Sequence, residues 1–301
     1  MKLTILGCHA ATPRTFTNPT AQVLEISGRL FLIDCGEGTQ VQLRRNKVRF
    51  MRINHVFISH LHGDHLYGLI GLVSTFMLLG RATDLHIHGP KGIKEIITLQ
   101  LRLGQAWTQY RLYFHELESD QPEIVFEDEK VTVTSVPLSH RIYTNGFVFR
   151  EKRGLRKLNI EAAESFGIDK CYYRNIVLGK DVTSNSGQLI SNDLVTFEPV
   201  PPKSYAFCSD TVFDPGIVPH IQGVDVLYHE STFLEREQAL AARTMHATAR
   251  QAAQIAKLAD VGTLVLGHYS TRYDSVADFG TEAAEIFPNV VLSQDGKTFE
   301  F

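Results

Sequence analysis

The sequence has few cysteines, no long apolar run and no excess of charge of either sign. Its 301 residues include four cysteines without CxxC spacing, which excludes a small disulfide-stapled fold and is typical of reduced thiols. No segment approaches the roughly 18 consecutive apolar residues of a membrane-spanning helix, and the first residues do not resemble a signal peptide. Lys and Arg number 30 against 33 Asp and Glu, so the basic surplus usual in polynucleotide-binding proteins is missing. We therefore expect a cytoplasmic globular protein with no membrane segment.

Histidine is the abundant residue, at 13 copies, and three of them fall in one short segment, Ser59-His-Leu-His-Gly-Asp-His65. His60 and His62 are two residues apart, so their side chains point the same way on an extended backbone. The following glycine allows a tight bend, after which Asp64 and His65 turn toward a second position. This spacing is typical of metal sites. The alternative is a helix N-terminus capped by Asp64, with three histidines that merely lie at the surface.

Strand-like and helix-like segments alternate along most of the chain. Strands are expected at Lys2–Leu6, Gln22–Ile26, Leu30–Asp34, Asn54–Ser59, Leu85–His88, Leu112–His115, Val131–Val136, Tyr205–Cys208, Val224–Tyr228 and Thr263–Leu266. Helices are expected at Gly38–Asn46, His65–Leu79, Gly92–Leu103, Leu234–Ala242 and Ala247–Leu258. This order predicts two sheets packed face to face and covered by helices, a layered α/β fold. Polar and proline-rich stretches mark residues from about 151 to 202 as an inserted segment.

Three further candidate ligands each follow a predicted strand. They are His140, Asp210 and His268. Taken singly, each could be a surface residue or a helix cap. Their repeated place at strand ends favours convergence on one edge of the sheets.

These residues resemble the metallo-β-lactamase superfamily, and nearly the whole chain is similar to its ribonuclease Z family. The motifs that carry the narrower resemblance are Asp34-Cys-Gly-Glu-Gly-Thr-Gln40, Ser59-His-Leu-His-Gly-Asp-His65, His229-Glu-Ser-Thr232, Thr244-Met-His-Ala-Thr248 and Gly267-His-Tyr-Ser-Thr-Arg-Tyr273. Members of this family are endonucleases that trim the 3′ end of transfer RNA precursors.

The resemblance implies a four-layer αββα sandwich, a single domain over residues 1–301 with residues of about 151–202 as an arm that grips transfer RNA. It also implies two zinc ions per subunit, and the same donors accept manganese. One zinc would be held by His60, His62 and His140, the other by Asp64, His65 and His268, with Asp210 bridging the two. Asp34 would hold a ligand histidine in place, the alternative being an ordinary strand-to-helix turn.

The implied reaction is hydrolysis of one phosphodiester, which leaves a 3′-hydroxyl on the transfer RNA and a 5′-phosphate on the trailer. Asp64 would act as general base or orient the attacking water, His246 would give a proton to the departing 3′ oxygen, and Glu230 would orient His246. The resemblance further implies a homodimer. Two alternatives stay open: a hydrolase of small phosphodiesters, lactones or thioesters on the same fold, and a non-catalytic RNA-binding protein.

Local basic clusters are expected to provide the positive potential that RNA needs. One consists of Arg44, Arg45, Lys47, Arg49 and Arg52. The other, at the start of the inserted segment, consists of Arg150, Lys152, Arg153, Arg156 and Lys157. The chain departs from the family pattern at Pro13–Asn18, where many members have Pro-x-Lys-x-Arg-Asn, and at Ser209, where they have glycine. The Lys-rich, Gly-Pro arm tip of the family is not apparent in Gly167–Lys180.

Overall fold

The computed structural model describes residues 1–12 and 14–301, so Pro13, the first residue of the segment that departs from the family pattern, lies outside the described residues. Contacts between Cα atoms divide the chain into two compact units. The larger unit comprises Met1–Arg150 and Lys203–Phe301, and the smaller unit comprises Glu151–Pro202. Among the described residues, no helix has both the length and the apolar character needed to cross a membrane.

The first sheet of the larger unit is seven-stranded among the described residues, with strand order β18-β1-β2-β3-β4-β5-β6. Its strands are β1 (Lys2–Gly7), β2 (Ala21–Ile26), β3 (Arg29–Ile33), β4 (Ile53–Phe57), β5 (Leu85–Pro90), β6 (Leu112–Leu117) and β18 (Thr298–Glu300). Strands β3 to β6 run parallel to one another, so their carboxyl ends lie at the same edge.

The second sheet is also seven-stranded within the described part of the chain, with strand order β17-β16-β15-β14-β9-β8-β7. Its strands are β7 (Glu123–Glu127), β8 (Val131–Leu138), β9 (Thr144–Glu151), β14 (Ser204–Cys208), β15 (Val226–Glu230), β16 (Thr263–Gly267) and β17 (Val290–Leu292). The four strands β14 to β17 are parallel, whereas β9 runs antiparallel to β14.

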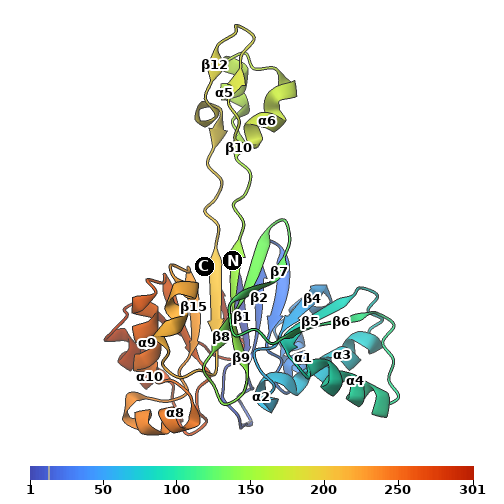
Figure 1. Ribbon diagram of the computed structural model, residues 1–301, viewed down its shortest axis with the longest axis vertical. Coiled ribbons are helices and arrows are strands. Elements are labelled where there is room, and N and C mark those ends of the chain that lie inside the picture. Colours follow the sequence, from blue (N-terminus) through green and yellow to red (C-terminus); the bar gives the residue numbers. More distant parts are fainter. Residues whose placement is uncertain (13) are drawn as a thin grey trace. The chain divides into compact units, whose positions relative to one another are not determined.

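Helices cover the outer faces of the paired sheets. Figure 1 shows α3 and α4 on one side of the sheets, and α9 and α10 on the other. The helices of the larger unit are α1 (Thr39–Arg45), α2 (Gly63–Leu66), α3 (Gly68–Leu78), α4 (Ile93–Leu103), α7 (Val218–Ile221), α8 (Gln238–Thr244), α9 (Ala249–Leu258) and α10 (Ala277–Ala284). Between the sheets, Phe31 and Phe57 of the first pack on Phe149 of the second with ring centroids 5.4 and 5.3 Å away. The α/β prediction of two covered sheets is therefore confirmed.

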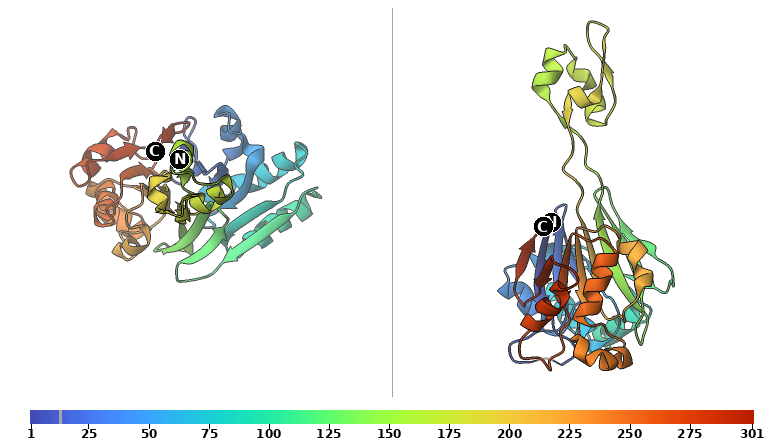
Figure 2. Two further views of the ribbon diagram at one scale, coloured as in Figure 1. Left: turned by 90° about the horizontal axis from the view of Figure 1, so that it is seen from above. Right: turned by 90° about the vertical axis from the view of Figure 1, so that its left-hand side faces the viewer.

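The chain ends meet within the larger unit. Strand β1 pairs antiparallel with β18, and the Met1 amino group donates a hydrogen bond to the Phe301 carbonyl at 3.3 Å. Figure 2 shows the two termini side by side in both of its views. The edge strand of the first sheet on this side, β18, therefore comes from the far end of the sequence.

Every predicted strand overlaps an observed one, but the predicted single helix His65–Leu79 is wrong. The structure divides it into α2 and α3, because the Gly68 amide donates to the Cys35 carbonyl at 2.9 Å, outside the helix. A Cβ at Gly68 would lie 1.9 Å from the Gly36 carbonyl oxygen, so this approach requires glycine. The helix predicted at Leu234–Ala242 begins instead as a 3₁₀ turn, η5 (Glu235–Glu237), before α8. Strand β9 was not predicted, since its Thr-Asn-Gly start reads as a turn.

The smaller unit has its own compact core. Ala163, Ile168, Ile176, Val182, Ile190 and Val195 are buried together there. Its elements are β10 (Lys157–Leu158), α5 (Ile160–Ser165), η2 (Lys170–Tyr172), α6 (Tyr173–Val177), β11 (Val182–Thr183), β12 (Leu189–Ile190), η3 (Asn192–Leu194) and β13 (Thr196–Phe197). Strand β10 pairs with β13, and β11 pairs with β12.

Candidate metal centre

A cleft of about 440 Å³ lies at the carboxyl-end edge of the two sheets. Its walls include His62, Asp64, Asp210, His246 and His268. The loop after β4 carries His60, His62, Asp64 and His65, whereas His140, Asp210 and His268 follow β8, β14 and β16. The structure therefore brings together the seven residues predicted as metal ligands.

Backbone strain accompanies this convergence. Asp34, Asp210 and His268 have φ angles of 55°, 60° and 59°. This is the left-handed backbone conformation, which residues other than glycine seldom adopt. Each follows a strand of the sheets by one or two residues. Such strain is retained where the surrounding structure enforces it, typically at functional sites.

Asp210 lies at the centre of the group, with each carboxylate oxygen facing a different set of histidines. Its Oδ1 lies 3.2 Å from His65 Nε2 and 3.2 Å from His268 Nε2. Its Oδ2 lies 3.6 Å from His60 Nε2 and 3.8 Å from His140 Nε2. One carboxylate is thus shared between two clusters of nitrogen donors.

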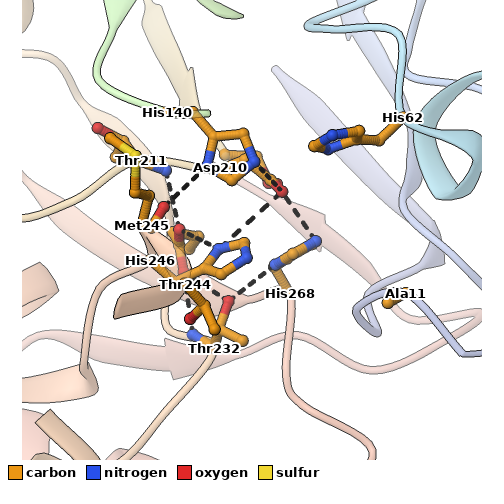
Figure 3. Close-up of polar contacts among 12 residues, drawn as sticks. Ala11, His62, His140, Asp210, Thr211, Thr232, Thr244, Met245, His246 and His268 are labelled. Atoms are coloured by element: carbon orange, nitrogen blue, oxygen red, sulfur yellow. Dashed lines mark hydrogen bonds and ion pairs between the residues drawn. The ribbon is translucent and has the colours of Figure 1, made fainter. Parts of the chain in front are cut away.

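The first cluster consists of His60, His62, His140 and Asp210, whose ligand atoms all lie within 4.8 Å of one another. His60 Nε2 is 2.9 Å from His62 Nδ1. Figure 3 shows the imidazole of His62 turned toward His140 and Asp210, and the rings of His62 and His140 are 5.2 Å apart. The second cluster consists of Asp64, His65 and His268, within the same limit.

Hydrogen bonds orient the second-cluster imidazoles with one nitrogen facing the cleft. Asp34 Oδ2 accepts from His65 Nδ1 at 2.6 Å and from Ser59 Oγ at 2.9 Å. The proton on His65 Nδ1 leaves the lone pair on Nε2, the atom that faces Asp210. The predicted role of Asp34, holding a ligand histidine, matches this contact.

Thr232 orients the imidazole of His268 as Asp34 orients that of His65. Its hydroxyl donates to Glu230 Oε2 at 2.5 Å, so it accepts the proton of His268 Nδ1 at 2.9 Å. The lone pair of His268 then lies on Nε2, which again faces Asp210. Figure 3 shows this contact between Thr232 and His268.

His140 provides the clearest sign that the clusters fit a cation. Its Nδ1 donates to the Met245 carbonyl at 2.8 Å, whereas its buried Nε2 has no hydrogen-bond partner among residues 1–12 and 14–301. A buried nitrogen lone pair without a partner is costly in the folded state. Neutral imidazoles with carboxylates are the donor set of zinc sites, so the residues present fit divalent cations.

Electrostatics lead to the same conclusion. Burial lowers the pKa of His60, of His62 and of His140, which keeps these imidazoles neutral and able to act as ligands. Burial also opposes protonation of His65, but Asp210, Asp64 and Asp34 raise its pKa well above the usual value. The carboxylates therefore attract positive charge into a buried site, which is what a bound cation provides.

His246 lies beside the clusters and is held by Glu230. Glu230 Oε1 accepts from His246 Nδ1 at 2.8 Å and from the Thr211 amide at 2.8 Å. Although burial opposes protonation, the charge of Glu230 raises the pKa of His246 to about 9. Glu230 therefore favours the protonated form of His246, which is the form that has a proton to donate.

Asp64 is positioned by a contact that carries no sequence signal. The backbone amide of Ala11 donates to Asp64 Oδ2 at 2.8 Å. The loop that carries Ala11 is held by Asp295, which accepts from the amides of Cys8 at 3.1 Å and Asn18 at 2.7 Å. Sequence reasoning also missed Arg141, which follows His140 and lines the cleft.

The basic cluster predicted for RNA binding is partly neutralised. Arg153 and Arg156 both pair with Glu198, and Arg156 also contacts Asp193 at 2.7 Å. Arg150 Nη2 is 3.4 Å from the His220 carbonyl. The side chain of Lys157 is exposed and has no hydrogen bond or ion pair with any described residue.

Comparison with known proteins finds one family model and several curated relatives, and the two carry different descriptions. A family model described as Anti-Pycsar protein Apyc1 matches residues 1–155. The curated ribonuclease Z of Bacteroides thetaiotaomicron is 45% identical over 294 residues, which cover 98% of this chain and 93% of that protein. The ribonuclease Z of Porphyromonas gingivalis W83 is 45% identical over 291 residues, 97% of this chain and 96% of that protein.

Solved structures agree with the fold. The crystal structure of the short form of human tRNase Z matches with a TM-score of 0.73 and 27% identity, covering 100% of this chain and 99% of that one. The metallo-β-lactamase fold protein YhfI from Bacillus subtilis matches in fold with a TM-score of 0.69 at 18% identity, covering 99% and 98% of the two chains. The predicted metallo-β-lactamase sandwich is therefore confirmed.

Proposed function

The chain belongs to the ribonuclease Z family, and on that basis we propose that it is a metal-dependent endoribonuclease that removes the 3′ trailer from precursor transfer RNA. The observation that supports this most directly is the position of Asp210. Its two oxygens face separate donor clusters, at 3.2 Å from His268 Nε2 and 3.6 Å from His60 Nε2. A carboxylate shared in this way suits a pair of cations, the arrangement that phosphodiester hydrolysis uses.

We propose that the pair is zinc, two ions per subunit, because neutral imidazole with carboxylate is a typical zinc donor set; manganese accepts the same donors. His60, His62 and His140 would hold one ion, and Asp64, His65 and His268 the other, with Asp210 shared. When bound, the two ions supply Lewis-acid activation of water and neutralise charge on the phosphodiester.

Asp64 and His246 would act on opposite sides of the reacting phosphorus. A carboxylate that holds a cation is a weak base, so Asp64 would mainly orient the attacking water. The amide of Ala11 keeps Asp64 Oδ2 in place. His246, protonated and aligned by Glu230, would give its proton to the departing 3′ oxygen. The products are a 3′-hydroxyl on the transfer RNA and a 5′-phosphate on the trailer.

The test is incubation with an end-labelled precursor transfer RNA, with and without a chelator. We expect one cleavage near the 3′ end of the mature transfer RNA, lost on chelation and restored by zinc. Of the two ends made by the cut, only the 5′ end of the trailer should carry a phosphate. Asp64→Ala, with its fold checked by circular dichroism, is expected to abolish cleavage. Rapid hydrolysis of a small phosphodiester, lactone or thioester by a protein that leaves the precursor intact would contradict the proposal.

We also propose that the smaller unit binds the transfer RNA. Lys157, Lys170, Arg174 and Lys180 are exposed in this unit and form no ion pair with the described residues. Phosphate contacts by such residues need no particular RNA sequence, which suits recognition of a folded transfer RNA by shape. Because Arg153 and Arg156 already pair with acidic side chains, the contribution of Arg150–Lys157 rests mainly on Lys157.

A homodimer in the cytoplasm completes the proposal. Leu78 and Leu103 end α3 and α4, and Trp107 lies in the loop after α4. Their side chains are 81%, 74% and 74% exposed, which is unusual for residues of this size. Light scattering should give twice the chain mass of 33.8 kDa, and Leu103→Glu should give the monomer. All four cysteines are free thiols, which fits a reducing compartment.

A further inference from the structure

Arg141 is the single Lys or Arg side chain among the described residues that line the cleft. It is exposed, and its side chain forms no hydrogen bond or ion pair with any described residue. Most other ionisable groups in the cleft are held by neighbours, as His246 is by Glu230. The guanidinium of Arg141 therefore keeps all of its donors for something outside the protein.

The backbone beneath Arg141 is held firmly on both sides of the cleft. The Ser139 carbonyl accepts from the Val212 amide at 3.0 Å, and the Ser139 amide donates to Thr211 Oγ1 at 3.3 Å. One residue on, His140 Nδ1 donates to the Met245 carbonyl. The Cα of Arg141 is thus fixed relative to the proposed ligands, so its exposed side chain starts from a defined point at the mouth of the cleft.

Arg141 faces the same space as the proposed site residues. It lines the cleft together with His62 and His246, which come from different loops. Its positive charge is therefore placed beside both a proposed metal ligand and the proposed proton donor.

The groups that would touch the scissile phosphate are buried, in contrast to Arg141. Asp210 is 2% exposed and His246 is 9% exposed. With the scissile phosphate on these buried groups, a neighbouring phosphate of the same strand would lie nearer the solvent, on the side of the exposed Arg141. Arginine binds phosphate through parallel N–H donors and keeps its charge at any physiological pH.

We propose that Arg141 forms a second phosphate subsite, which binds the phosphate adjacent to the scissile one and so favours a polynucleotide over an ester with a single phosphate. This inference rests on the proposed function, because it assumes that RNA enters the cleft. It makes Arg141 a specificity residue, distinct from the groups that act on the scissile bond.

Arg141→Gln separates the two kinds of substrate. For precursor transfer RNA we expect kcat/KM to fall by about 10- to 100-fold, mostly through a higher KM. The slope of the logarithm of the binding constant against the logarithm of the salt concentration should become shallower by about one. For bis(p-nitrophenyl) phosphate, which has one phosphate, we expect kcat/KM within twofold of wild type. Arg141→Lys should retain part of the RNA activity. Arg111→Gln, which removes an exposed arginine outside the cleft, is the matched control.

Fluorescence anisotropy can measure the binding of a single-stranded oligoribonucleotide in the presence of a chelator. This measurement tests the subsite without catalysis. Weaker binding by Arg141→Gln than by Arg111→Gln supports the inference, and equal binding overturns it. An equal loss of activity on RNA and on bis(p-nitrophenyl) phosphate also overturns it, since Arg141 would then act at the scissile phosphate. A wild-type protein that binds the oligoribonucleotide through Arg141 but leaves precursor transfer RNA intact contradicts the proposed function instead.

Discussion

Glu230 Oε1 accepts a hydrogen bond from His246 Nδ1 at 2.8 Å, and this buried pair connects the proposed proton donor with the proposed metal ligands. The other oxygen of Glu230 accepts from Thr232, whose hydroxyl in turn accepts from His268. One carboxylate therefore orients both a histidine that would donate a proton and a histidine that would hold a cation.

Glu230→Gln is expected to lower kcat for precursor transfer RNA by about 100-fold, within the range of general acid catalysis, with little change in KM. Glu230 raises the pKa of His246 to about 9, so removal of its charge lowers that pKa. Because the protonated imidazole is the active form, activity should be lost at lower pH than in the wild type. The double variant Glu230→Gln, His246→Ala should have a kcat only slightly below that of Glu230→Gln. If the two substitutions lowered kcat independently, Glu230 would not act through His246.

His140→Ala and His268→Ala are each expected to reduce both metal content and rate. The two residues belong to different clusters, so each variant should hold about one cation instead of two. The rate should fall by roughly 100-fold or more, since even the outer partners of ligands contribute 10- to 100-fold. Elemental analysis beside kinetics is the measurement, with the exposed His220→Ala as control. Two cations and full activity in either variant would show that the ligand assignment is wrong.

Acid stability should depend on histidines that have no part in the cleft. His55 of β4 stacks on His86 of β5 at 4.8 Å, and His88 of β5 stacks on His115 of β6 at 4.3 Å. Burial, with the neighbouring imidazoles, lowers the pKa of His55 to about 4 and that of His88 to about 2. The unfolded chain takes up these protons near pH 6.5, so the free energy of unfolding falls as the pH drops from there toward 4.

His88→Phe removes one of these groups and keeps a ring in the stack. The fall in unfolding free energy between pH 6.5 and 4 should become shallower by about 1.4 kcal/mol per pH unit. Urea unfolding at several pH values, in a chelator so that metal loss does not contribute, is the measurement. A slope equal to that of the wild type would show that His88 is protonated in the folded chain as readily as in the unfolded one.

The basic residues of the smaller unit should separate into two kinds. Lys157→Gln is expected to leave folding unchanged. For transfer RNA binding, the slope of the logarithm of the binding constant against the logarithm of the salt concentration should become shallower by about one, as for loss of a single phosphate contact. Arg156→Gln removes contacts with Glu198, Asp193 and Thr196, and should destabilise the smaller unit by about 2 kcal/mol. Filter binding over a salt series and limited proteolysis distinguish the two. Identical behaviour of both variants would contradict this division.

Local sequence was enough to predict the features that depend on neighbouring residues. The Ser59–His65 segment shows its ligand spacing directly, because two residues on an extended backbone share a face and a glycine allows the turn that follows. Apolar periodicity located the central strands for the same reason. Strand β9 and the break between α2 and α3 could not be predicted in this way. The break comes from a hydrogen bond of the Gly68 amide to the Cys35 carbonyl, which lies far away in the sequence and leaves no mark on the apolar periodicity.

The sequence by itself determined the donor types, their places after strands and the family to which the chain belongs. Only the tertiary structure decided which oxygen of Asp210 faces which cluster, that Ala11 holds Asp64 through a backbone amide, and that Arg141 stands unpaired at the mouth of the cleft. The physical reason is that these relations join residues far apart in the chain. The distances between them are set by the packing of one sheet on the other. Every residue but proline has a backbone N–H, so no local sequence pattern distinguishes the Ala11 amide that contacts Asp64.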